Sequence, residues 1–81
     1  MTMTIKDQLQ PYLGEMVKFT LRVEEGRPIR KPGRVSGRVY SCEDNHVAYI
    51  DGIGNLQYIA YAHIAHLRQA WDDENWPTEP K

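Results

Sequence analysis

The stretch Arg34–Asp51 reads RVSGRVYSCEDNHVAYID. In its first half, apolar Val35 and Val39 point to one side and Arg34, Ser36 and Arg38 to the other, the period of two that a half-buried strand requires. A polar run from Ser41 to His46 interrupts this pattern, and Val47–Ile50 resumes it. The stretch therefore predicts two antiparallel strands joined by a polar turn.

Gly37 lies on the apolar side of the first of these strands. A glycine inside a strand has no side chain to pack, so it marks a sharp bend or a close approach by another backbone. Small barrels turn their corners at such positions. We therefore expect the two strands to belong to a strongly bent sheet.

Three further strands are expected, with few residues between most of them. The clearest alternation is in Glu15–Glu24, and a long basic loop with two prolines, Glu25–Gly33, follows it. After the glycine-rich turn at Asp51–Asn55, Leu56–Ala62 reads as a strand. In that strand we expect Leu56, Tyr58, Ala60 and Ala62 to face the core and Tyr61 to face away from it. A short closing strand, His63–Arg68, carries Ile64 and Leu67 inward.

A short helix is expected before the first strand. Thr4 can cap it, and the apolar residues that fall on one helical face are Ile5, Leu9, Tyr12 and Leu13. Pro11 either kinks this helix or starts a new turn, and Gly14 is a natural stop.

At 81 residues the chain is expected to form one domain, residues 1–68, followed by an acidic tail, residues 69–81. The predicted fold is mainly β: a small, strongly bent, five-stranded antiparallel barrel of the SH3-like or Sm-like kind, with a short N-terminal helix. Trp71 and Trp76 are costly to expose, so the tail is expected to dock on its own domain or on a partner.

Charge is distributed unevenly although the formal net charge is only −1. Most of the ten Lys and Arg residues lie between Lys18 and Arg38, whereas the tail is acidic. This pattern fits a basic binding face with a solubilising or self-masking extension, or simply two solvated faces.

Several classes of protein are disfavoured. Cys42 is the single cysteine, which leaves no internal disulfide and no thiolate cluster for zinc. We find no apolar run long enough to span a bilayer and no signal peptide, so we expect a cytoplasmic protein without a membrane partner. His63 and His66 would lie on opposite faces of a strand, which disfavours a shared metal ion. No catalytic set can be assembled from these residues, so we expect neither an enzyme nor a cofactor.

Three short stretches resemble the Sm-like family, and the Hfq branch is the most similar. The stretches are Leu9–Leu13, then Gly37–Val39 together with Glu43–Val47, and Tyr61–Ile64, which resembles a Tyr-Lys-His motif. The resemblance covers roughly residues 4–67. It implies a homo-oligomeric ring, a hexamer or heptamer, that binds short single-stranded RNA, U-rich or A-rich, without catalysis.

The resemblance also implies where RNA would bind. Asn45 and His46 would lie in the base-contacting turn, Gln10 near the helix-side face, and Tyr61 and His63 at the pore. Ala62 stands where the family has a lysine, and the loop between the first two strands is longer than the family's.

Each candidate residue also has an ordinary structural role. Asn45 can bind a base edge or only satisfy its turn, and His46 can stack on a base or be an exposed turn residue. Tyr61 and His63 can contact RNA or pack at an interface. The basic residues Arg30, Lys31 and Arg34 can attract phosphate or form a solvated loop. The alternative function is a protein-interaction adaptor, such as a small phage or regulatory module, that uses the basic loop and the Trp-containing tail.

Overall fold

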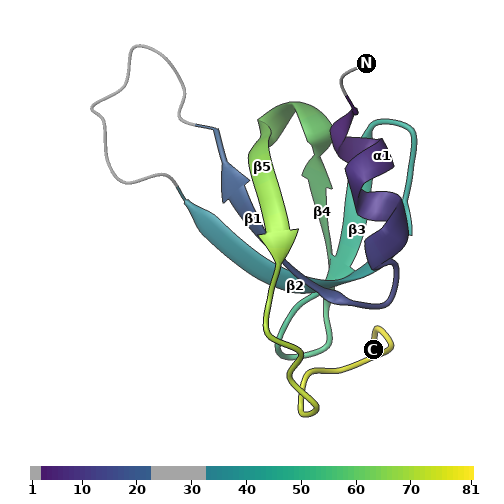
Figure 1. Ribbon diagram of the computed structural model, residues 1–81. Coiled ribbons are helices and arrows are strands. Elements are labelled where there is room, and N and C mark those ends of the chain that lie inside the picture. Colours follow the sequence, from purple (N-terminus) through teal and green to yellow (C-terminus); the bar gives the residue numbers. More distant parts are fainter. Residues whose placement is uncertain (1–2, 23–32) are drawn as a thin grey trace.

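The computed structural model describes residues 3–22 and 33–81 of the chain. A short helix precedes a five-stranded antiparallel sheet (Figure 1). The elements are, in chain order, α1 (Ile5–Leu9), the 3₁₀ turn η1 (Gln10–Tyr12), β1 (Met16–Leu21), β2 (Arg34–Cys42), β3 (His46–Ile50), β4 (Leu56–Ala60), the 3₁₀ turn η2 (Tyr61–His63) and β5 (Ile64–Gln69). The predicted end of the first strand and most of the basic loop lie outside the described residues.

The strand order is β4-β3-β2-β1-β5, and every neighbouring pair is antiparallel. Register shifts between Val39 and Ser41 on β2 and between Thr20 and Leu21 on β1 mark local irregularities of the kind that bend strands. The sheet curves strongly (Figure 1). Within the described residues β4 and β5 do not pair with each other, so the expected closed barrel is not found and both strands are sheet edges.

Position 37 requires glycine because a neighbouring side chain, and not another backbone, approaches it closely. A Cβ atom at this position would lie 2.1 Å from Cδ2 of Tyr49, whose ring is buried. Tyr49 also packs against Phe19 in the core, with ring centroids 5.7 Å apart. The tyrosine ring therefore occupies the space that any larger residue at position 37 would need.

The helix begins as expected, because the Thr4 hydroxyl accepts a hydrogen bond from the Asp7 amide at 3.1 Å. Pro11 ends α1 and lies in the first turn of η1, so the helix restarts there as a 3₁₀ turn. Gly14 has a φ of 82°, which suits glycine. Leu13 was expected on the apolar face but is 47% exposed, since the chain has left the helix at that point.

The side of β4 that faces the core was predicted wrongly. Tyr58 is 61% exposed, whereas Ile59 and Tyr61 pack against the core. The strand also ends at Ala60, and Tyr61–His63 forms η2. Both sides of this strand are partly apolar, so alternation alone did not indicate the buried side.

The core lies between the curved sheet and α1. Its buried residues come from the helix and from four strands, namely Leu9, Val17, Phe19, Val39, Val47, Tyr49 and Ile64. Leu67 packs against it, as expected for β5. No helix in the described part of the chain is long and apolar enough to cross a membrane.

The C-terminal segment, residues 70–81, folds back on the domain. The Trp76 indole Nε1 donates to the Ile50 carbonyl at 2.7 Å, and the Lys81 amide donates to the Gly54 carbonyl at 2.8 Å. Trp76 thus docks as expected. Trp71 does not, since it is 91% exposed.

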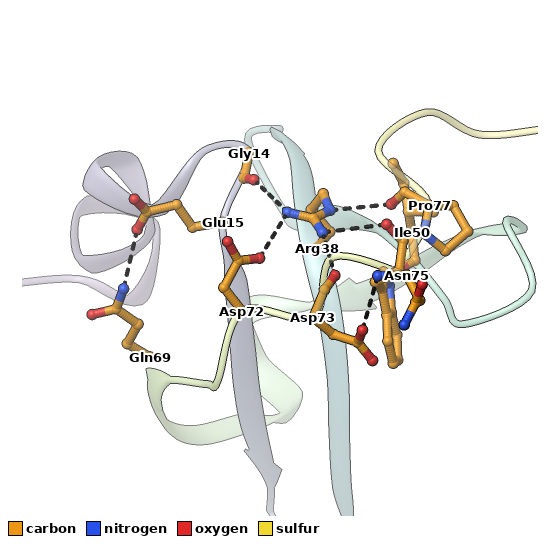
Figure 2. A network of polar contacts seen from close by, with 10 residues as sticks. Gly14, Glu15, Arg38, Ile50, Gln69, Asp72, Asp73, Asn75 and Pro77 are labelled. Atoms are coloured by element: carbon orange, nitrogen blue, oxygen red, sulfur yellow. Dashed lines mark hydrogen bonds and ion pairs between the residues drawn. The ribbon is translucent and has the colours of Figure 1, made fainter.

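Arg38 holds this segment in place (Figure 2). We predicted that it points away from the core, which is correct, yet it is only 7% exposed because the tail covers it. Its guanidinium donates to five oxygens: the carbonyls of Gly14 (3.1 Å), Asp73 (3.2 Å), Trp76 (3.3 Å) and Pro77 (3.1 Å), and the carboxylate of Asp72 (3.5 Å). A single side chain therefore joins β2, the segment before β1 and the tail.

Candidate nucleic-acid interface

Two segments far apart in the sequence meet at one end of the sheet. They are the turn between β2 and β3 and the 3₁₀ turn η2. The Tyr61 amide donates to the Asn45 carbonyl at 3.1 Å, and the Tyr61 hydroxyl donates to the Glu43 carbonyl at 2.6 Å. Tyr61 therefore fixes η2 against the turn that contains Asn45 and His46.

Tyr61 was expected to face away from the core, and this was wrong, because its ring packs partly against the core cluster. Burial, followed by the neighbouring Cys42 thiol and the carboxylates of Glu43 and Asp44, raises the pKa of Tyr61 to about 12. Burial also raises the pKa of the Cys42 thiol, although the hydrogen bond with Tyr61 opposes this effect. Both groups are therefore protonated at neutral pH, and neither is prepared to act as a nucleophile.

An aromatic pair lies beside this contact between η2 and the β2–β3 turn. His46, the first residue of β3, packs edge-on against Tyr58 of β4 with ring centroids 5.3 Å apart. His46 is half-buried, whereas Tyr58 is largely exposed. Exposed aromatic faces are surfaces on which unpaired bases stack. Tyr58 was not among the predicted site residues, because the alternation in Leu56–Ala62 predicted that its side chain faces the core.

Asn45 is exposed at the tip of the same turn. Its carbonyl is occupied by Tyr61, and its side chain makes no hydrogen bond with a described residue. A free amide offers both a donor and an acceptor to a base edge. Asn45 and the His46–Tyr58 pair thus combine groups that could bind a base edge and a base face.

The charges around this group are mostly negative. Glu43 and Asp44 are exposed in the turn, and Lys6 of α1 forms an ion pair with Asp44 at 3.3 Å. Ala62, exposed in η2, adds no charge. The turn itself therefore carries no cation, and the cations on neighbouring segments are Lys6, which is paired with Asp44, and Arg22, whose Nε donates to the Ile64 carbonyl after η2 at 3.5 Å.

The remaining predicted site residues lie elsewhere or at the margin. Gln10 is exposed at the start of η1, and His63 is exposed at the end of η2, where its carbonyl accepts from the Arg22 amide at 2.8 Å. Arg34 starts β2, at the opposite end of that strand from Asn45. The other two, Arg30 and Lys31, lie outside the described residues.

His63 and His66 do not share a strand, because His63 lies in η2 and His66 in β5. The premise that both belong to one closing strand was therefore wrong. Within residues 3–22 and 33–81 there is no group of three or more His, Cys, Asp or Glu side chains that could hold a metal ion.

The candidate interface defined by this geometry consists of Asn45, His46 and Tyr58, fixed by Tyr61. Comparison of the chain with protein-family models, with curated proteins and with solved structures found no match.

Proposed function

We propose that this chain is a non-catalytic single-stranded RNA-binding protein that acts as a homo-oligomeric Sm-like ring. The observation that carries the proposal is the hydrogen-bonded contact between the Asn45 turn and η2, with half-buried His46 and exposed Tyr58 packed together beside it. These two segments are the ones that resemble the Sm-like motifs. Their side chains provide hydrogen bonding and stacking, the two contacts by which unpaired bases are bound.

The sheet edges support self-association. Within the described part of the chain neither β4 nor β5 has a partner on its outer side. The sequence of β4, LQYIA, contains no charged residue and no proline, the usual means by which proteins protect an edge strand. A strand from a partner would hydrogen-bond with the unpaired backbone N–H and C=O groups of this edge.

The two open edges also permit a head-to-tail assembly. If β4 of one copy pairs with β5 of the next, the contact is head-to-tail, and such contacts close into rings when the rotation allows. Tyr58 lies on the β4 edge. The candidate interface would therefore lie close to the junction between neighbouring copies.

Binding of short oligo-uridine and oligo-adenosine, measured by fluorescence anisotropy, tests the proposal. The substitutions Asn45→Ala and His46→Ala should weaken binding, by about 1 to 3 kcal/mol for a lost stacking contact. Asn55→Ala is the matched control, since Asn55 is also an exposed turn asparagine but lies in the β3–β4 turn. Equal affinity of all variants would remove Asn45 and His46 from the site, and no binding of either RNA by the native chain would refute the function.

A protein-interaction adaptor is the second candidate, and the exposure of Trp71 favours it. Large aromatic residues are frequent anchors in protein interfaces. An adaptor predicts no affinity for either oligonucleotide and loss of a purified protein partner on Trp71→Ala. Deletion of the whole tail is a poorer test, because it would also uncover Arg38.

A further inference from the structure

The face of the sheet opposite the core carries a group of cations. On β1 the residues that alternate with buried Val17 and Phe19 point to this outer face, as do their partners on the neighbouring strands. The register places Lys18 between Ser36 and Arg68, and Thr20 between Arg34 and His66. Two adjacent rows of the outer face therefore hold three full positive charges and a histidine.

No carboxylate balances these charges within the strands. The sequences of β1, β2 and β5 contain no Asp or Glu. Lys18 and Arg68 lie directly opposite each other, an arrangement that destabilises a strand pair when the charges are alike. Neither forms an ion pair with a described residue. An anion bound between the two side chains would relieve this repulsion.

A groove continues from these rows toward the tail. It has a volume of about 340 Å³ and is formed by Met16, Lys18 and Ser36 of the sheet and by Ala70, Trp71, Asp72, Asp73 and Trp76 of the C-terminal segment. Trp71 is 91% exposed at its wall. The lining thus includes an exposed aromatic ring, Trp71, and a cation, Lys18, together with the carboxylates of Asp72 and Asp73.

We infer that this outer face is a second contact surface for single-stranded RNA, with one base against Trp71 in the groove and the adjoining phosphates over Lys18 and Arg68. The inference rests on the proposed function and extends it. An aromatic platform beside a positively charged track is the arrangement by which proteins bind single strands without reading their sequence. It also supplies the cations that the Asn45 turn lacks.

The charge pattern favours RNA over an acidic peptide. A polyanion of either kind would be attracted to Lys18, Arg34 and Arg68, but Asp72 and Asp73 form part of the groove. These carboxylates would repel any anion placed inside the groove, a carboxylate or a phosphate, whereas they can accept hydrogen bonds from the N–H groups of a base or from the hydroxyls of ribose. A stacked base with its ribose therefore fits the groove better than a glutamate side chain, while the phosphates lie over Lys18 and Arg68.

The test uses the full chain with oligo-uridine and oligo-adenosine, and compares Trp71→Ala and the double variant Lys18→Gln/Arg68→Gln with the native protein. Trp71→Ala should weaken binding by about 5- to 150-fold, the range for one lost base stack. The double variant should lower the slope of log affinity against log salt by about 1.4, since each single-strand phosphate contact contributes about 0.7.

Matched controls lie at the β3–β4 turn. Ile53→Ala removes an apolar side chain that is 65% exposed, and Lys81→Gln removes a cation that packs against Gly54. Both should bind as the native protein does. Circular dichroism and the oligomeric state of each variant establish that it is folded.

The two proposals fail in different ways. If Trp71 and Lys18/Arg68 variants bind normally while Asn45 and His46 variants do not, the outer-face inference is overturned and the proposed function stands. If only the outer-face variants lose affinity, the inference stands and the Asn45 turn is not the site. Displacement of RNA by oligo-glutamate at equal charge concentration would show a general polyanion surface and overturn the inference.

Discussion

The most informative perturbation of the fold is Arg38→Gln. Only 9% of the Arg38 side chain is exposed. Its guanidinium donates to five oxygens, of which three are carbonyls of the C-terminal segment. Glutamine is shorter and uncharged, so it cannot reach these acceptors together. We expect the C-terminal segment to detach from the sheet while the strands remain folded.

The size of the effect follows from what the tail can regain in water. Hydrogen bonds from a charged donor contribute about 1.5 to 3 kcal/mol each, so a simple sum for Arg38 would rival the whole stability of a small domain. Once the tail is free, however, its carbonyls bind water. The loss is then limited to the docking of the tail, chiefly the hydrogen bond and partial burial of Trp76. We expect Arg38→Gln to lower the free energy of unfolding by about 2 to 4 kcal/mol.

Thermal unfolding and hydrogen exchange measure this change. A loss of that size should lower Tm by about 8 to 30 °C for a domain of this length. The amides of Ala70, Trp76 and Lys81, which are hydrogen-bonded in the native fold, should exchange faster than those of β3. Arg34→Gln, an exposed arginine on the same strand, is the control and should change little. A loss below about 1 kcal/mol with unchanged tail exchange would refute this role of Arg38.

Two further predictions concern single residues in the sheet and in η2. Gly37→Ala should destabilise the domain by about 1 to 3 kcal/mol in urea unfolding, because the added Cβ would overlap the buried Tyr49 ring. The control is Gly33→Ala, whose Cβ would meet Leu21 at an ordinary 3.5 Å and which should not destabilise the domain. Equal stability of the two variants would contradict the packing of Tyr49 against Gly37. Because burial raises the pKa of Tyr61 to about 12 in the folded state, this tyrosine should ionise only near pH 12, and the stability linked to its raised pKa is complete below pH about 10 and is lost as pH rises toward 12. Absorbance of tyrosinate during an alkaline titration checks this, and Tyr61→Phe should remove the transition near pH 12.

The sequence predicted the elements of this fold well where one face alone is apolar. The strict alternation in β1 and β2 located these strands, and the Thr4 cap and Gly14 located the ends of the helical segment. Alternation was less informative for Leu56–Ala62, where tyrosine, isoleucine and alanine occur on both sides. Only tertiary packing determines that Ile59 is half-buried and Tyr58 exposed.

The role of Arg38 could not be predicted from local pattern, because its cover comes from residues that lie more than thirty positions later in an irregular segment. The only signal was the coincidence of a basic strand and an acidic tail. The candidate site was partly predictable, since Asn45, His46 and Tyr61 were named from a resemblance. The hydrogen bonds that join Tyr61 to Asn45 and Glu43 depend on the meeting of two distant turns, which no spacing reveals.

Native mass spectrometry tests the central claim most directly. The protein, purified with nuclease treatment and held at low micromolar concentration, is measured alone and with short oligo-uridine or oligo-adenosine. We predict a closed ring, a hexamer or heptamer, that gains RNA. A monomer or dimer that binds neither oligonucleotide would contradict both the assembly through β4 and β5 and the proposed function.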